Sequence, residues 1–101
     1  MLNYNTNEKK QEEKQKIAVA LSYNPGEEAP TVIATGKGAL AERIIQTAED
    51  VEVPVYEDEK LAKTLSKLEL GDMIPPELYG VVAEILVFVD KMDKIKSKVI
   101  N

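Results

Sequence analysis

Apolar and polar residues occur in distinct blocks at the start of the sequence. Residues 17–23 form an apolar run that stops at Asn24-Pro25-Gly26, a tripeptide that favours a turn. The β-branched segment 31–35 follows, and Gly36-Lys37-Gly38 ends it. The two runs predict two β-strands, which we expect to pair antiparallel.

Helical spacing begins after these strands. From Ala39 the apolar residues recur three and four positions apart, and charged residues take the other face as far as Asp50. Residues 53–56 then form a short apolar segment. Its Pro54 cannot donate a ladder hydrogen bond and therefore suits an edge strand. A helix between two strands predicts a parallel crossover.

Two further helices are expected. Glu57 and Asp58 supply acceptors at the start of a short helix that closes before Gly71. Pro75-Pro76 begins the last and longest helix, because a proline in the first turn loses no hydrogen bond. The apolar stripe of this helix comprises Leu78, Tyr79, Val82, Ala83, Leu86 and Val89, widened by Val81, Ile85 and Phe88. The sequence thus predicts an α/β fold, a small mixed β-sheet of about three strands packed with three or more helices.

The two ends of the chain are polar and charged. Residues 1–16 offer too little apolar surface to offset the entropy lost on ordering. We therefore expect a flexible arm at 1–16 and one domain at 17–101. Toward the other end, Lys91, Lys94, Lys96 and Lys98 are interleaved with apolar residues and are expected to form a solvated helix end, with contact to an acidic surface as the alternative.

Composition excludes several kinds of chemistry. The chain has no cysteine and no histidine, which removes disulfides, thiolate nucleophiles and Cys/His metal sites. Residues 17–90 carry five basic and fourteen acidic side chains, a charge of −9 that argues against nucleic acid as a partner. No apolar run is long enough to cross a membrane and no secretory signal is readable, so we expect a cytoplasmic protein without direct membrane insertion.

Three groups of residues are candidates for chemistry. Gly36-Lys37-Gly38 precedes a helix and could hold a phosphate, but it lacks the spacing of a P-loop, and a plain turn is the preferred interpretation. Glu57-Asp58-Glu59 could bind a hard cation, but helix capping is preferred. Ser22, Ser66 and Ser97 have no histidine to activate them. We therefore expect no catalytic residue, no metal site and no cofactor.

Several motifs occur in one order along residues 17–90. They are Ala18-Val19-Ala20-Leu21-Ser22-Tyr23, Ala29-Pro30 with Val32 and Gly36, Val53-Pro54, Leu61-Ala62-Lys63-Thr64-Leu65, Ile74-Pro75-Pro76-Glu77-Leu78-Tyr79, and Val82-Ala83-Glu84-Ile85-Leu86. In this order they resemble the C-terminal cytoplasmic domain of the FlhB/YscU family of type III secretion export-gate proteins. The family's membrane domain and the strand before its cleavage loop are absent, so the chain resembles the stand-alone form, and Met1 favours a natural start.

This resemblance implies a role in flagellar protein export. The expected partners are export-apparatus proteins and export substrates, reached in the cytoplasm or at the cytoplasmic face of the membrane through the export gate. The expected function is that of a non-cleaving accessory that binds these partners and contributes to substrate-specificity switching. The family match also implies that Ala29, Pro30, Ala83 and Leu86 form one exposed apolar dimple for export signals; buried core is the alternative for Ala83 and Leu86.

The resemblance also leads to a prediction about autocleavage. Members of the family carry an Asn-Pro-Thr-His loop before the first matching strand, and its asparagine cyclises to split the chain. Here that register reads Glu13-Lys14-Gln15-Lys16, and Asn24-Pro25 lies after the strand. We expect the purified protein to remain one polypeptide after prolonged incubation, as measured by intact mass spectrometry. Fragments that end at Asn24 or within residues 13–16 would contradict this.

Two other functions stay open on the sequence. One is a small phosphate- or nucleotide-binding α/β enzyme that uses Gly36-Lys37-Gly38 together with the carboxylates at 57–59. The other is a regulator whose acidic body competes for a basic partner outside export.

Overall fold

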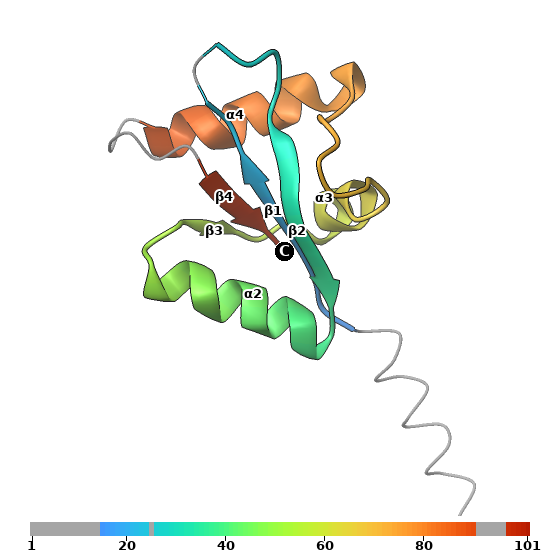
Figure 1. Ribbon diagram of the computed structural model, residues 1–101, viewed down its shortest axis with the longest axis vertical. Helices are drawn as coiled ribbons and strands as arrows, with labels where there is room; N and C mark the ends of the chain where they lie inside the picture. The colour runs from blue at the N-terminus through green and yellow to red at the C-terminus, as the bar shows by residue number, and fades with distance from the viewer. Residues whose placement is uncertain (1–14, 25, 91–96) are drawn as a thin grey trace, which may run out of the picture.

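A four-stranded mixed sheet forms the centre of the fold (Figure 1). The computed structural model describes residues 15–24, 26–90 and 97–101, without the side chains of residues 87–90. The strands are β1 (Ile17–Ser22), β2 (Thr31–Lys37), β3 (Val55–Tyr56) and β4 (Ser97–Ile100), in the order β2-β1-β4-β3. β1 is antiparallel to both β2 and β4, whereas β3 is parallel to β4.

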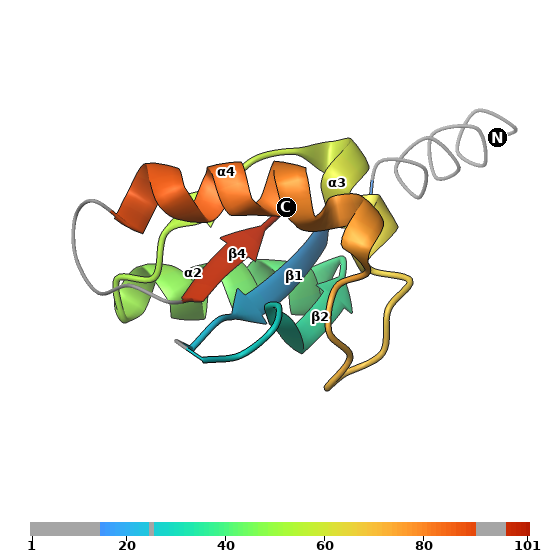
Figure 2. The same cartoon turned by 90° about the horizontal axis from the view of Figure 1, so that it is seen from above.

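Helices cover both faces of the sheet (Figure 2). α2 (Ala39–Asp50) lies on one face. α3 (Glu59–Leu65) and α4 (Tyr79–Asp90) lie on the other, and the short 3₁₀ helix η1 (Pro76–Leu78) leads into α4. Within the described part of the chain, no helix is both long enough and apolar enough to cross a membrane.

Coverage of both faces explains why the first strand reads as a continuous apolar run. Successive side chains of a strand point to opposite faces. Ala18 and Ala20 pack in the cluster under α2, while Val19 and Leu21 belong to the larger cluster under α3 and α4. A strand buried on both sides has no polar face, so its sequence shows no alternation.

The predicted elements between residues 17 and 86 are largely confirmed. The first two strands pair antiparallel, with a bulge opposite Ala20 and Leu21. The helix at Ala39–Asp50 has the predicted bounds. β3 is an edge strand, as Pro54 indicated, and it runs in the same direction as β2 with two strands between them. Residues 1–14, where we expect a flexible arm, lie outside the described residues.

The prediction of a solvated helix end is wrong for Lys98. Residues 97–100 instead form a fourth strand in the interior of the sheet. Lys98 is only 1% exposed, and its Nζ donates a hydrogen bond to the backbone oxygen of Ile85 in α4, at 3.1 Å. The other lysines of this group, at 91, 94 and 96, lie outside the described residues.

The last helix is less buried than its wide apolar stripe indicated. Val82 and Ile85 are buried in the core, whereas Tyr79, Val81 and Ala83 are exposed and Leu86 is half-buried. The side chains at 88 and 89 lie outside the described part. One side of α4 therefore faces the sheet, and an adjoining apolar strip reaches solvent.

The capping role predicted for Asp58 is confirmed. Asp58 is the N-cap of α3, and its Oδ1 accepts a hydrogen bond from the backbone nitrogen of Leu61 at 3.1 Å. We expect Asp58→Ala to lower the free energy of unfolding by about 1 kcal/mol, because this bond satisfies a free amide of the first turn. Urea unfolding measures the change. The exposed neighbour Glu57, changed to Ala, serves as control, and an equal loss in both variants would contradict the assignment.

Candidate functional site

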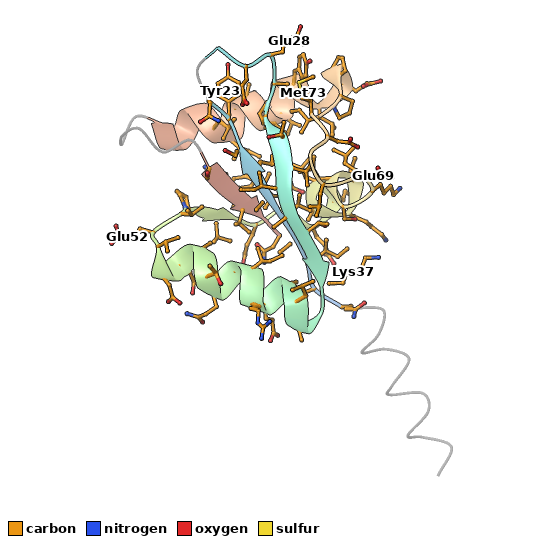
Figure 3. The ribbon with its side chains drawn as sticks, viewed as in Figure 1. Tyr23, Glu28, Lys37, Glu52, Glu69 and Met73 are labelled. Carbon is orange, nitrogen blue, oxygen red and sulfur yellow. The ribbon has the colours of Figure 1, made fainter. Side chains whose placement is uncertain are left out.

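A cavity of about 320 Å³ lies between the loop that joins β1 to β2 and the first turns of α4. Its lining comprises Tyr23, Glu28, Ala29, Pro30, Ile74, Tyr79, Val82, Ala83 and Leu86. All four residues predicted for partner binding are in this set. We call this cavity the apolar pocket. Figure 3 shows two of its residues, Tyr23 and Glu28, at the end of the sheet beside α4.

A tight turn and a short β-bridge hold the loop side of the pocket. The backbone nitrogen of Asn24 donates to Glu27 Oε1, and the backbone nitrogen of Glu27 donates back to the oxygen of Asn24, each at 3.0 Å. Gly26 in this turn has a φ of 97°, which glycine adopts without strain. Beyond the turn, the oxygen of Pro30 accepts a hydrogen bond from the nitrogen of Ile74 at 2.9 Å.

The chain enters α4 a few residues after the bond between Pro30 and Ile74. Pro75 follows with an extended backbone and is the N-cap position of η1, and Leu78 N donates to Pro75 O at 2.9 Å. The chain thus turns into α4 directly beside the Ala-Pro loop. Segments about 50 residues apart in the sequence meet here because of this connection.

The helix side of the pocket comes from one strip of α4. Tyr79, Val82, Ala83 and Leu86 are spaced by three and four residues and therefore share a face. Val82 is buried and belongs to the core, whereas Ala83 and Tyr79 are exposed and Leu86 is half-buried. The pocket is thus open to solvent along its helix side.

The two halves of the predicted dimple differ in exposure. Ala29 is 2% exposed and Pro30 is buried, so they form the closed side of the pocket. Ala83 and Leu86 form its open side. The alternative for these two residues was a place in the core. Leu86 is half-buried and agrees with it in part, whereas Ala83 is exposed and does not.

The chemistry of the pocket suits an apolar group. Its lining is aliphatic and aromatic apart from the carboxylate of Glu28, which is exposed. An apolar side chain that entered would remove apolar surface from water, and that favours binding. A cationic group next to that side chain would lie near Glu28.

Sequence reasoning did not name every residue that lines the pocket. Tyr79 and Val82 could have been found, because they share the helical spacing of Ala83 and Leu86. Tyr23 and Ile74 carry no such signal. They reach the pocket only because β1 ends under it and the bridge at Pro30 brings residue 74 alongside.

The glycine-lysine-glycine segment does not end the second strand at residue 35, as the sequence predicts, and only its last glycine lies in the turn before α2. Gly36 and Lys37 are the last residues of β2, and Gly38 is the N-cap of α2 with a φ of 60°. The amide of Gly38 donates to the oxygen of Lys16 at 2.8 Å and is therefore not available to an anion. Figure 3 shows Lys37 at this end of β2, away from the apolar pocket.

Asp58 and the three serines among the remaining candidates have structural partners. Asp58 caps α3, as described above, and the hydroxyl of Ser66 donates to the oxygen of Lys63 at 2.8 Å. Ser22 and Ser97 are paired across β1 and β4. Within the described residues, no three acidic side chains lie close enough together to hold a metal ion.

Comparisons with known proteins match most of this chain. Residues 13–89 match the model of the FlhB HrpN YscU SpaS family. The Bacillus subtilis (strain 168) protein YlqH is 46% identical over 83 residues, which cover 80% of this chain and 89% of YlqH. The flagellar biosynthetic protein FlhB of Aquifex aeolicus (strain VF5) is 44% identical over 75 residues, 72% of this chain and 21% of that protein. The chain thus spans about a fifth of the length of this FlhB.

Solved structures agree with the sequence matches. A mutated EscU C-terminal domain superposes with a TM-score of 0.72 and 39% identity, over 77% of this chain and 80% of that one. The PscU C-terminal domain superposes with a TM-score of 0.69 and 29% identity, over 73% and 96% of the two chains. The fold described here is therefore similar to that of these C-terminal domains.

Proposed function

Since the chain belongs to the FlhB HrpN YscU SpaS family, we propose that it acts in flagellar type III protein export by binding apolar segments of export substrates or export-gate proteins in the apolar pocket. Relatives include flagellar biosynthetic proteins and a secretion system apparatus protein, SsaU of Salmonella typhimurium. Under this proposal the protein is an accessory of the export gate and performs no chemistry.

One observation carries the proposal. Ala29, Pro30, Ala83 and Leu86 come from two distant segments, and all four line one open apolar cavity. A small exposed alanine on a helix leaves room for another side chain, and the buried Ala-Pro segment gives that side chain a fixed surface to pack on. An extended segment with one or two apolar side chains is the kind of ligand that fits.

The site of action follows from the partners. The protein would bind substrates in the cytoplasm and dock at the cytoplasmic face of the membrane through export-gate components. By competing for one class of substrate there, it would contribute to the switch from rod–hook to filament export.

Direct binding to purified rod–hook substrates tests the proposal. We expect saturable binding by fluorescence anisotropy, with competition between two rod–hook substrates for one site. The proposal would be contradicted if the protein bound neither these substrates nor the FlhB proteins of the same cell.

No observation favours the phosphate-binding enzyme. The amide of Gly38 is already bonded to Lys16, and the carboxylate of Asp58 is used as a helix cap. That alternative is not supported. The family match also gives no support to the second alternative, a regulator that acts outside export.

A further inference from the structure

The inner strand β4 holds the two sides of the sheet together. It pairs antiparallel with β1, from Val19 opposite Ile100 to Ser22 opposite Ser97, and parallel with β3 on its other side. Figure 1 shows β4 between β1 and β3. Among the described strands, β4 is the single neighbour of β3, so β1 and β3 form the two walls of the position that β4 occupies.

The family match includes the two strands beside β4 but not β4 itself. The family match covers residues 13–89, which include β1, β3, α3 and most of α4. It does not reach β4 at Ser97–Ile100. The part of the chain shared with the family therefore builds the β4 position, and residues outside that part fill it.

Backbone hydrogen bonds at this position accept an extended chain of almost any sequence. Val99 N donates to Pro54 O and Asn101 N donates to Tyr56 O, each at 3.0 Å, and Asp58 N donates to Asn101 O at 2.6 Å. Such main-chain pairing gives affinity in strand addition, while the side-chain surroundings give specificity.

The side-chain surroundings define a short pattern. On the α2 side, Val99 packs in a cluster with buried alanines of β1 and α2, and larger aliphatic side chains, Ile44, Ile45, Val53 and Val55, pack against this cluster. On the other face, Ile100 lies in the main core and Lys98 donates to the backbone oxygen of Ile85. The position therefore selects a long side chain ending in a hydrogen-bond donor, then a β-branched residue, then a large aliphatic one.

Two features of the resident strand lower the free energy that its insertion gains. Burial of an ammonium group such as that of Lys98 costs free energy even when the group is paired. The Oδ1 of Asn101 is buried with no hydrogen-bond partner among the described residues. β4 has only four residues, so few ladder bonds break when it leaves.

From these observations we propose that the β4 position is a strand-acceptor site. β4 leaves this site, and an extended segment of another protein pairs with β1 and β3 in its place. That segment carries a long side chain that ends in a hydrogen-bond donor, then a β-branched residue, then a large aliphatic residue. The occupant is a protein segment because the walls offer free main-chain partners at strand spacing once β4 has gone. This site is separate from the apolar pocket and does not depend on the proposed function.

Two variants of the full chain and one peptide test this proposal. The probe is a fluorescent peptide with the sequence of residues 97–101, and the control peptide carries glutamate at the position of Lys98. Lys98→Glu weakens the insertion of β4 without altering either wall. Ser22→Cys with Ser97→Cys joins paired residues, and the chain has no other cysteine, so the oxidised monomer holds β4 in place.

We expect Lys98→Glu to bind the probe at least tenfold more tightly than the wild type does, and to bind the control peptide no better than the wild type does. The oxidised double-cysteine variant should not bind, and reduction should restore wild-type binding. If Lys98→Glu is unfolded, recovery of its circular dichroism signal on addition of the probe supports the proposal, and no recovery overturns it.

Three results would overturn the proposal. They are the absence of probe binding to Lys98→Glu, equal binding with and without the disulfide, and equal binding of probe and control. Sedimentation velocity tests whether the occupant is instead β4 of a second copy of this chain. A wild-type dimer that the disulfide abolishes would mean that β4 of a second copy takes the position, and would overturn the assignment to another protein.

Discussion

Replacing Lys98 with glutamate is expected to lower the free energy of unfolding by about 3–5 kcal/mol, the cost of leaving a buried charge without its partner. Lys98 is 1% exposed in the middle of the sheet, and its ammonium group donates to the oxygen of Ile85. A carboxylate there would face that oxygen, and neither group can donate to the other. Urea unfolding followed by circular dichroism gives the change.

A matched surface variant separates burial from overall charge. Lys67→Glu makes the same change in net charge at an exposed residue, and we expect it to alter stability by no more than about 0.5 kcal/mol. Lys98→Met keeps a long side chain without the charge and should cost much less than glutamate. If Lys98→Glu and Lys67→Glu lowered the free energy of unfolding equally, Lys98 would not be buried in β4.

Ala83→Asp is expected to weaken capture of rod–hook substrates at least several-fold. The new carboxylate would lie at the open side of the apolar pocket. An apolar group that bound there would remove water from the carboxylate and offer it no hydrogen bond in return. The fold should persist, because Ala83 is exposed and the lower helix propensity of aspartate costs less than about 0.7 kcal/mol. Capture and melting temperature are measured on the same samples.

The control for this variant lies in the same helix. Gly80→Asp adds an equal charge in the first turn of α4, where a carboxylate is favourable, and apart from the adjacent residues and the backbone of its own helix no atom lies within 4 Å of the added Cβ. Gly80 does not line the pocket, so capture should be unchanged. Normal capture by Ala83→Asp would reject the pocket, and a collapse of its melting temperature would mean that Ala83 belongs to the core.

The patterns that predicted the fold correctly are those set by local chemistry. Helical spacing located Ala39–Asp50, and the acceptor at Asp58 located the start of α3. An apolar run ended by Asn24-Pro25-Gly26 located the first strand, and a β-branched run located the second. In each case the residues that determine the element lie within it or within a few residues of its ends, so the sequence alone was sufficient.

The strand β4 could not be found in this way. Its residues, Ser97, Lys98, Val99 and Ile100, follow three other lysines and look like a charged end. Lys98 is buried where α4 places the oxygen of Ile85 at its tip, and no local pattern records that contact. The register of β4 between β1 and β3 is likewise a tertiary property.

The candidate site was predicted by resemblance and not by pattern. Periodicity placed Ala83 and Leu86 on an apolar stripe, but it could not tell a core position from an exposed one. The structure separates them, because Val82 and Ile85 take the core face and leave Ala83 exposed. Ala29 and Pro30 lie in a loop, and backbone bonds that join residues 30–32 to residues 71–74, among them the bond from Ile74 to Pro30, bring that loop beside the start of α4.

The central claim, that export partners bind in the apolar pocket, is tested most directly by amide chemical-shift mapping. Labelled protein is titrated with a purified rod–hook export substrate. The account predicts shifts centred on Ala29, Ala83 and Leu86, with little change at exposed residues of α2 such as Glu42 and Glu49 on the opposite face. Shifts confined to α2, or no shifts at saturating substrate, would contradict it.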